Sequence, residues 1–172
     1  VLFRSVTATY AVAITYATIS SHEATDLQGN NVTTTLSADS KTLTGSNINK
    51  SGNDDAYHFV GFQISGQDGK TTVTMTITNN GSTTMQGGLW LAQEKGNKYC
   101  NAIGISSVSG SGVTSGSVGG KAAVVFSIAT GNSLTITITY SSSIGSGYQF
   151  RLLPYANAGF TGSVTISNIY FG

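Results

Sequence analysis

Short runs in which every second residue is apolar recur along this chain, and they favour folds built from β-sheet. In Lys70–Thr78 and Ser133–Tyr140, apolar side chains alternate with threonine. A period of two is typical of an antiparallel strand with one face in a core and one in water. Further runs of this kind are Asn31–Leu36, Ala56–Ile64, Gly88–Gln93, Tyr99–Ile105, Ala122–Ala129, Tyr148–Leu153 and Gly162–Phe171.

The spacing of these runs predicts the class of fold. The chain has 172 residues, enough for one domain with a sizeable core, and no segment shows a helical period with caps. About ten short strands separated by turn residues predict an all-β antiparallel β-sandwich, either immunoglobulin-like or jelly-roll. Asn79-Asn80-Gly81-Ser82 has the composition of a hairpin turn, and Gly104–Gly120 is expected to form an exposed flexible loop.

The first nineteen residues, Val1–Ile19, carry the same alternation over a length greater than one strand normally has. Strands run about 5–6 residues. We therefore divide the segment into a first strand of the chain's own sheet, Tyr10–Ile19, and a preceding strand that is free to pair with another molecule. The predicted organisation is a donor strand over residues 1–9 and a single sandwich domain over residues 10–172. The donor residues are Val1, Leu2, Phe3, Val6 and Ala8.

Two other interpretations of this segment remain open. One is an N-terminal helix of the type IV pilin kind, and the other is an ordinary edge strand that serves only its own domain. Nine of the nineteen residues are Val, Ile or Thr, which favour a strand over a helix. The chain begins at Val1 without Met, so we expect an N-terminus that has been processed or cut from a longer chain.

The composition argues against several classes of partner. Only 9% of the residues are charged, against about 25% in ordinary domains. The six lysines and two arginines are scattered and the formal net charge is +1, which speaks against nucleic-acid binding. No apolar run is long enough to span a membrane. The 47 serines and threonines favour an extracellular surface that packs against copies of itself. The single cysteine, Cys100, is expected to be a small buried residue.

Two segments resemble a known family. Tyr16-Ala-Thr-Ile-Ser-Ser-His-Glu23, followed by Gly29-Asn-Asn-Val-Thr33, resembles the opening of the camelysin/TasA family, with Ile19 where an aromatic residue is usual. Thr71–Thr83 is similar to the strand of that family that ends in Asn-x-Gly-Ser. The resemblance covers about the first half of the chain.

This resemblance implies a secreted structural subunit of a cell-surface filament, as in biofilm fibres and in archaeal relatives that form bundling pili. Such subunits polymerise with copies of themselves by donor-strand complementation, in which the N-terminal strand of one copy completes the sheet of the next. For this chain, the closing run offers a candidate acceptor wall formed by Val164, Ile166 and Ile169. Strict alternation would place Val164 and Ile166 on one face and Ile169 on the other. An ordinary core strand is the alternative.

No catalytic, metal or cofactor site is predicted. His22-Glu23 is not followed by a second histidine at the zinc-protease spacing, and His58 stands alone. No Gly-x-Ser-x-Gly elbow occurs. Asn53-Asp54-Asp55 has oxygen ligands suited to Ca²⁺, although a solvated turn is the favoured interpretation.

Two features of the sequence concern glycans: possible attachment sites and possible carbohydrate binding. Asn31, Asn49 and Asn80 fit the N-glycosylation pattern, although about three such sites are expected by chance from the abundance of Asn, Ser and Thr. A monomeric carbohydrate-binding or adhesin sandwich is the alternative function, and it would need a platform of exposed aromatic residues. Trp90, in Gly-Gly-Leu-Trp-Leu, is instead expected to be buried.

Overall fold

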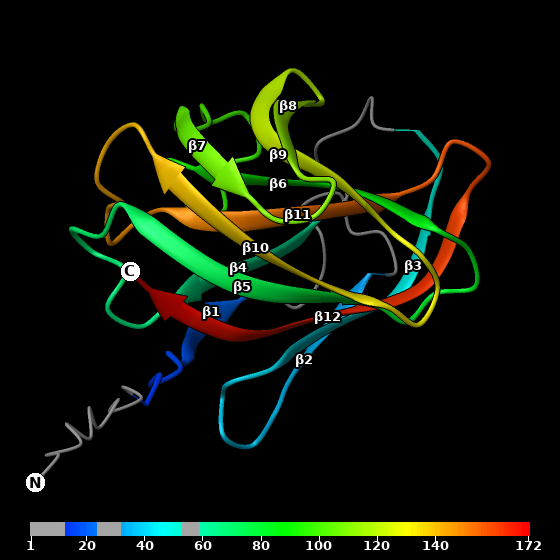
Figure 1. The fold of residues 1–172 in the computed structure, drawn as a ribbon, viewed down its shortest axis with the longest axis horizontal. Coiled ribbons are helices and arrows are strands. Elements are labelled where there is room, and N and C mark those ends of the chain that lie inside the picture. Colours follow the sequence, from blue (N-terminus) through cyan, green and yellow to red (C-terminus); the bar gives the residue numbers. More distant parts are fainter. Residues whose placement is uncertain (1–12, 24–31, 53–58) are drawn as a thin grey trace, which may run out of the picture.

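Two antiparallel six-stranded sheets lie face to face (Figure 1). The computed structural model describes residues 13–23, 32–52 and 59–172. The first sheet contains, in spatial order, β1 (Ile19–His22), β4 (Val60–Ile64), β11 (Gln149–Tyr155), β6 (Met85–Ala92), β9 (Lys121–Ile128) and β8 (Thr114–Val118). The second contains β2 (Thr33–Leu36), β3 (Leu43–Lys50), β12 (Phe160–Phe171), β5 (Thr72–Asn79), β10 (Ser133–Tyr140) and β7 (Ile105–Ser109). The predicted all-β antiparallel sandwich is confirmed.

The strand order identifies the kind of sandwich. Four short strands, β1, β2, β7 and β8, form the four sheet edges. The eight strands between them lie in the orders β4-β11-β6-β9 and β3-β12-β5-β10, which is the arrangement of a jelly roll. Of the two predicted types, the jelly roll is therefore the one present.

The outer face of the second sheet is lined by hydroxyl groups where β5 and β10 pair. Apolar residues of both strands point into the core, where Met75, Ile77 and Ile136 are fully buried. The intervening threonines and serine bond across the strands at 2.7–3.1 Å, as Thr72–Thr139, Thr74–Thr137, Thr76–Thr135 and Thr78–Ser133. This face carries the Thr/apolar alternation that predicted the two strands.

The first sheet is covered on both faces. Its inner face packs on the second sheet, and its outer face carries a second apolar cluster that includes Phe59, Trp90 and Leu153. Trp90 is 1% exposed, as predicted. The glycine pair in β6 permits this packing, because a Cβ on Gly88 would lie 2.0 Å from Val118 Cγ2. Glycine is therefore required there for close approach rather than for a special backbone conformation.

Several predicted strands differ from the observed ones. The run Ser133–Tyr140 matches β10, and the runs that predicted β5, β6, β9, β11 and β12 end within a few residues of the observed strands. The predicted loop Gly104–Gly120 is wrong, because it contains β7 and β8, which are edge strands of different sheets. The predicted strand Tyr99–Ile105 is wrong over residues 99–104, which form a loop with one isolated bridge between Ala92 and Ala102.

The strand β3 was not predicted from the sequence. Its sequence, Leu-Thr-Gly-Ser-Asn-Ile-Asn-Lys, lacks regular alternation because it contains a bulge. Asn47 has a φ of 58°, and Ile48 and Gly45 lie opposite Gly162 and Val164, so β3 has one residue more than β12 between these pairs. Gly45 replaces an expected apolar side chain, because a Cβ there would lie 2.4 Å from Val60 Cγ2.

Candidate functional site

The segment that leads into β1 is the first candidate site. Residues 13–16 are exposed, and two of their side chains are large and apolar: Ile14 is 55% and Tyr16 is 38% exposed. Among the described residues, backbone hydrogen bonding to the sandwich begins at Ala17, whose N–H donates to Ile169 O at 2.7 Å. The predicted strand Tyr10–Ile19 is wrong over residues 13–18, because β1 begins only at Ile19. The donor residues Val1, Leu2, Phe3, Val6 and Ala8 lie outside the described residues.

The candidate acceptor wall lies on β12, which is an inner strand of the second sheet. Val164 and Ile166 are fully buried and lie where β12 pairs with β3 on one side and β5 on the other. Beyond Ile166 the β3 side of β12 has no strand among the described residues, and Ala17 lies there instead. Ile169 belongs to this open stretch.

A bulge in β12 brings Ile169 to the same side as Val164 and Ile166. Ser167 pairs with Thr76 and Tyr170 with Thr74, so β12 has one residue more than β5 over this stretch. Asn168 takes up the extra residue with a φ of 51° and is exposed, while Ile169 is fully buried. The strict alternation assumed from the sequence is wrong at this point, and its physical cause is the bulge.

The far edges of both sheets form a second candidate surface. This side is closed by β7, β8 and the loop that joins them, and Ile105, Val108 and Val113 pack on the core while remaining half-buried. Residues Thr114–Ser117 of β8 are exposed. Neither edge strand has a pairing partner on its outer side within the part of the chain that the structure describes.

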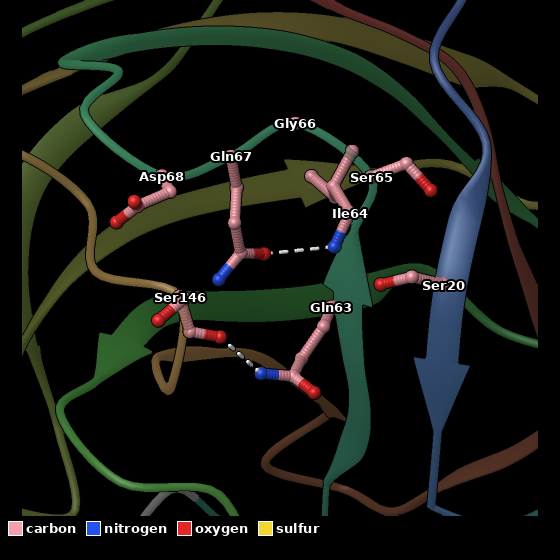
Figure 2. Close-up of a pocket in the computed structure, with 8 residues that line it drawn as sticks. All are labelled: Ser20, Gln63, Ile64, Ser65, Gly66, Gln67, Asp68 and Ser146. Carbon is pink, nitrogen blue, oxygen red and sulfur yellow. Dashed lines mark hydrogen bonds between the residues drawn. The ribbon is translucent and has the colours of Figure 1, made fainter.

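A polar groove of about 390 Å³ lies beside β1 and β4 (Figure 2). Gln67 is 3% exposed, and its amide accepts from Ile64 N at 2.8 Å and donates to two backbone carbonyls. Gln63 likewise donates to Ser146 O at 2.9 Å. The side-chain amides of Gln63 and Gln67 therefore shape the groove. The Asp68 carboxylate also lines it and makes no hydrogen bond or ion pair with the other described residues. A small polar ligand is the chemistry this groove can accept.

Arg151 is a buried charged residue that was not predicted from the sequence. It is 1% exposed on the outer face of the first sheet, with its guanidinium 4.5 Å from the centre of the Phe59 ring. Its Nη2 donates to Glu94 O and Asn97 O, both at 3.1 Å. Burial lowers the pKa of Arg151 from its usual value. These contacts fix the loop between β6 and β7 on the sheet, and nothing in the local sequence distinguishes this arginine from a surface one.

The loop that Arg151 holds carries the most exposed aromatic side chain of the described residues. Tyr99 is 68% exposed, and Lys98 Nζ lies 4.9 Å from the centre of its ring. Cys100 is half-buried rather than buried as predicted, with Sγ donating to Glu94 O at 3.6 Å. A single exposed aromatic ring offers a contact for a sugar but does not form the platform that the alternative function requires.

The predicted glycosylation and metal positions are only partly described. Asn49 and Asn80 are exposed, and Asn80 Nδ2 donates to Thr165 Oγ1 at 2.8 Å, whereas Asn31 lies outside the described residues.

His22 Nδ1 is 2.7 Å from Thr34 Oγ1. His58 and Asn53-Asp54-Asp55 also lie outside. The described residues contain no group of three or more His, Cys, Asp or Glu that could hold a metal. They also contain no helix of the length and apolarity needed to cross a membrane.

Comparison with known proteins returned one similar solved structure. No family model matches the chain, and no curated protein matches it significantly. The solved structure is that of TmCBM27, a carbohydrate-binding module that recognises mannan. It has 12% sequence identity and a TM-score of 0.40, over 91% of this chain and 87% of the module. A likeness of this size carries no conclusion about the ligand of this chain.

Proposed function

We propose that this chain is a secreted structural subunit that polymerises head-to-tail with copies of itself into an extracellular filament. In this proposal the N-terminal strand, residues 1–9, adds to a sheet of the next copy. The filament would serve in biofilm formation or in adhesion between cells. The chain itself performs no chemistry in this function and needs no cofactor.

One observation carries the proposal. Ile14 and Tyr16 are exposed, and both stand on the even positions that are mainly apolar from Leu2 onward. A contiguous exposed apolar surface is a common mark of a contact between proteins. Because the described part of the sandwich leaves Ile14 exposed and covers Tyr16 only in part, a second copy is the source of cover that we propose.

The energetics of strand addition are adequate for assembly. Burying Leu2 and Val6 would contribute about 1.5–3 kcal/mol each. Ladder hydrogen bonds would add roughly 0.5–1.5 kcal/mol apiece. The entropy of ordering the strand offsets much of this gain. The remainder is repeated at every junction, so that an open head-to-tail contact extends into a filament.

A monomeric carbohydrate-binding sandwich is the second candidate. The specific observation in its favour is the exposed ring of Tyr99, because sugar rings pack on exposed aromatic faces. The polar groove beside β1 and β4 adds hydrogen-bonding groups, including the Asp68 carboxylate. This function needs neither residues 1–9 nor a second copy, which makes the two candidates separable.

Electron microscopy of the full chain beside a variant that lacks residues 1–9 tests the proposal. We expect filaments from the full chain and dispersed, folded particles from the shortened one. Circular dichroism of both samples verifies that the sandwich remains folded. A binding assay against a panel of polysaccharides, with Tyr99→Ala as the matched variant, tests the second candidate in the same samples.

Filaments from both proteins would show that assembly does not need the N-terminal strand and would overturn the proposed mechanism. Dispersed particles from both, together with polysaccharide binding that Tyr99→Ala abolishes, would favour the carbohydrate-binding function instead.

A further inference from the structure

The core of the sandwich is incompletely covered at two opposite sides. At one side, where β1, β2 and the end of β12 meet, Ala17, Leu36 and Phe171 are half-buried against the core. At the other side, the half-buried apolar residues belong to β7 and to the loop that joins it to β8, and they are Ile105, Val108 and Val113. Figure 1 shows these sides at the bottom and the top of the molecule.

The chain enters the sandwich at the first of these sides. Residues 13–16 are exposed there, and Tyr16 lies beside Tyr170, with 6.3 Å between the ring centres. A strand donated from this side to the same side of a second copy would meet that copy's own strand coming the other way. Two strands exchanged in this manner close a symmetric pair and leave nothing for a third copy. A strand donated to the opposite side leaves one donor and one acceptor free, so that growth continues.

We propose that the acceptor is the outer edge of β7, so that the N-terminal strand of one copy extends the second sheet of the next. This inference rests on the proposed polymerisation. The residues Ile105–Ser109 pair with β10 on one side only, among the residues that the structure describes. The open edge of β7 therefore offers backbone groups for a further strand.

The side chains of β7 match a donor with one apolar face. Val108 lies opposite the buried Ile138, so it points toward the core, yet it stays half-buried at the sheet edge. Ser107 and Ser109 are exposed on the other face. A strand antiparallel to β7 with Val6 beside Val108 would place Ala8 beside Ile105 and Ser5 beside Ser109. Neighbouring β8 is less suitable, because Thr114–Ser117 carries no apolar side chain to cover.

The length of the N-terminal segment allows this geometry. A strand over residues 1–9 is longer than the five residues of β7. Residues 10–16 then form a link that spans about 23 Å when extended. This is enough to leave one copy and reach the edge of another without unfolding β1.

Disulfide trapping in the full-length chain tests the inference. All variants carry Cys100→Ser, and the donor carries Ser5→Cys. Three matched acceptors each place one serine-to-cysteine change on a different strand: Ser109→Cys on β7, Ser117→Cys on β8 and Ser167→Cys on the open part of β12. Donor and acceptor changes are placed on separate chains, mixed under assembly conditions and oxidised. Because neighbouring strands bring facing Cβ atoms close, only the true neighbour forms the bond efficiently.

We expect a linked dimer from the Ser5→Cys and Ser109→Cys pair, little product from the other two pairs, and a ladder of multimers when both changes lie on one chain. Trapping at Ser117→Cys or Ser167→Cys while filaments still form would overturn the β7 assignment and leave the polymerisation intact. An intramolecular bond in a monomeric double variant would also overturn it, because the strand would then serve its own copy. Absence of both filaments and linked species would overturn the inference together with the proposed function.

Discussion

At the scale of single residues, two buried polar groups differ in whether they have partners. Arg151 is surrounded by acceptors: Gln149 Oε1 at 2.9 Å and the carbonyls of Glu94 and Asn97. Tyr140 is 3% exposed, and its hydroxyl has no hydrogen-bond partner among the described residues. A satisfied buried group stabilises the fold through its bonds, while an unsatisfied one costs free energy. Arg151 therefore fixes a loop, and Tyr140 contributes only its ring.

The substitution Tyr140→Phe should leave the free energy of unfolding unchanged or raise it, by up to about 1–3 kcal/mol, because it removes an unpaired buried hydroxyl and keeps the ring. Chemical denaturation of both proteins measures this. Tyr16→Phe, at an exposed position, is the control and should have no effect. A loss of stability in Tyr140→Phe would show that the hydroxyl has a partner in solution.

The same residue gives the fold a dependence on alkaline pH. Burial raises the pKa of Tyr140 far above the usual value. In the unfolded chain the phenol loses its proton near pH 10, whereas in the folded chain it stays protonated. The stability associated with this residue is therefore complete below about pH 10 and is lost as the pH rises further. The fall in unfolding free energy between pH 9 and 11 should be shallower in Tyr140→Phe than in the parent chain.

At the scale of elements, two asparagine bulges decide which residues the second sheet presents. Asn47 in β3 and Asn168 in β12 both have positive φ, which asparagine tolerates better than most residues. Each bulge shifts the side chains that follow it to the other face. The bulge at Asn168 sends Ile169 into the core and ends the regular alternation of β12.

Replacing Asn168 with valine should destabilise the chain by about 1–2 kcal/mol, because a β-branched residue is unfavourable at positive φ. Asn168→Gly should remain close to the parent in stability. Ser167→Val, one residue earlier in the same strand, is the matched control and should cost little. Thermal unfolding distinguishes the three variants. Equal stability of Asn168→Val and Ser167→Val would contradict the bulge.

These elements also show how much of the molecule the sequence could predict. Strands such as β10, with unbroken alternation of Thr and apolar residues, were predicted with correct ends. The strand β3 was missed because Gly45 and a bulge interrupt its pattern, and the strands β7 and β8 were missed because serine and glycine dominate them. The role of Arg151 depends on a loop far away in sequence. Local patterns report one strand at a time, whereas bulges, edges and buried charges depend on its neighbours.

At the scale of the whole molecule, assembly is expected to depend on one face of the N-terminal strand. Leu2→Asp removes about 1.5–3 kcal/mol of apolar burial at each junction. The concentration of free subunit at which filaments appear should therefore rise about 10- to 100-fold, since 1.4 kcal/mol corresponds to a factor of ten. Sedimentation of filaments over a concentration series measures this.

The matched control for that experiment is Ser5→Asp, which introduces the same charge on the opposite face of the strand. It should shift the assembly concentration far less than Leu2→Asp. Equal effects from the two variants would show that charge, rather than the buried face, controls assembly.

The paired hydroxyls on the outer face of the second sheet have a consequence for the conditions in which the protein can work. Where these hydroxyls are exposed, as in the pairs Thr76–Thr135 and Thr78–Ser133, they hold water at the surface without carrying charge. Dissolved ions screen only charges, so such a surface gives them little to act on. With only 9% charged residues, copies of this chain should approach each other with little mutual repulsion, and their contacts should be much the same in dilute water as in brine.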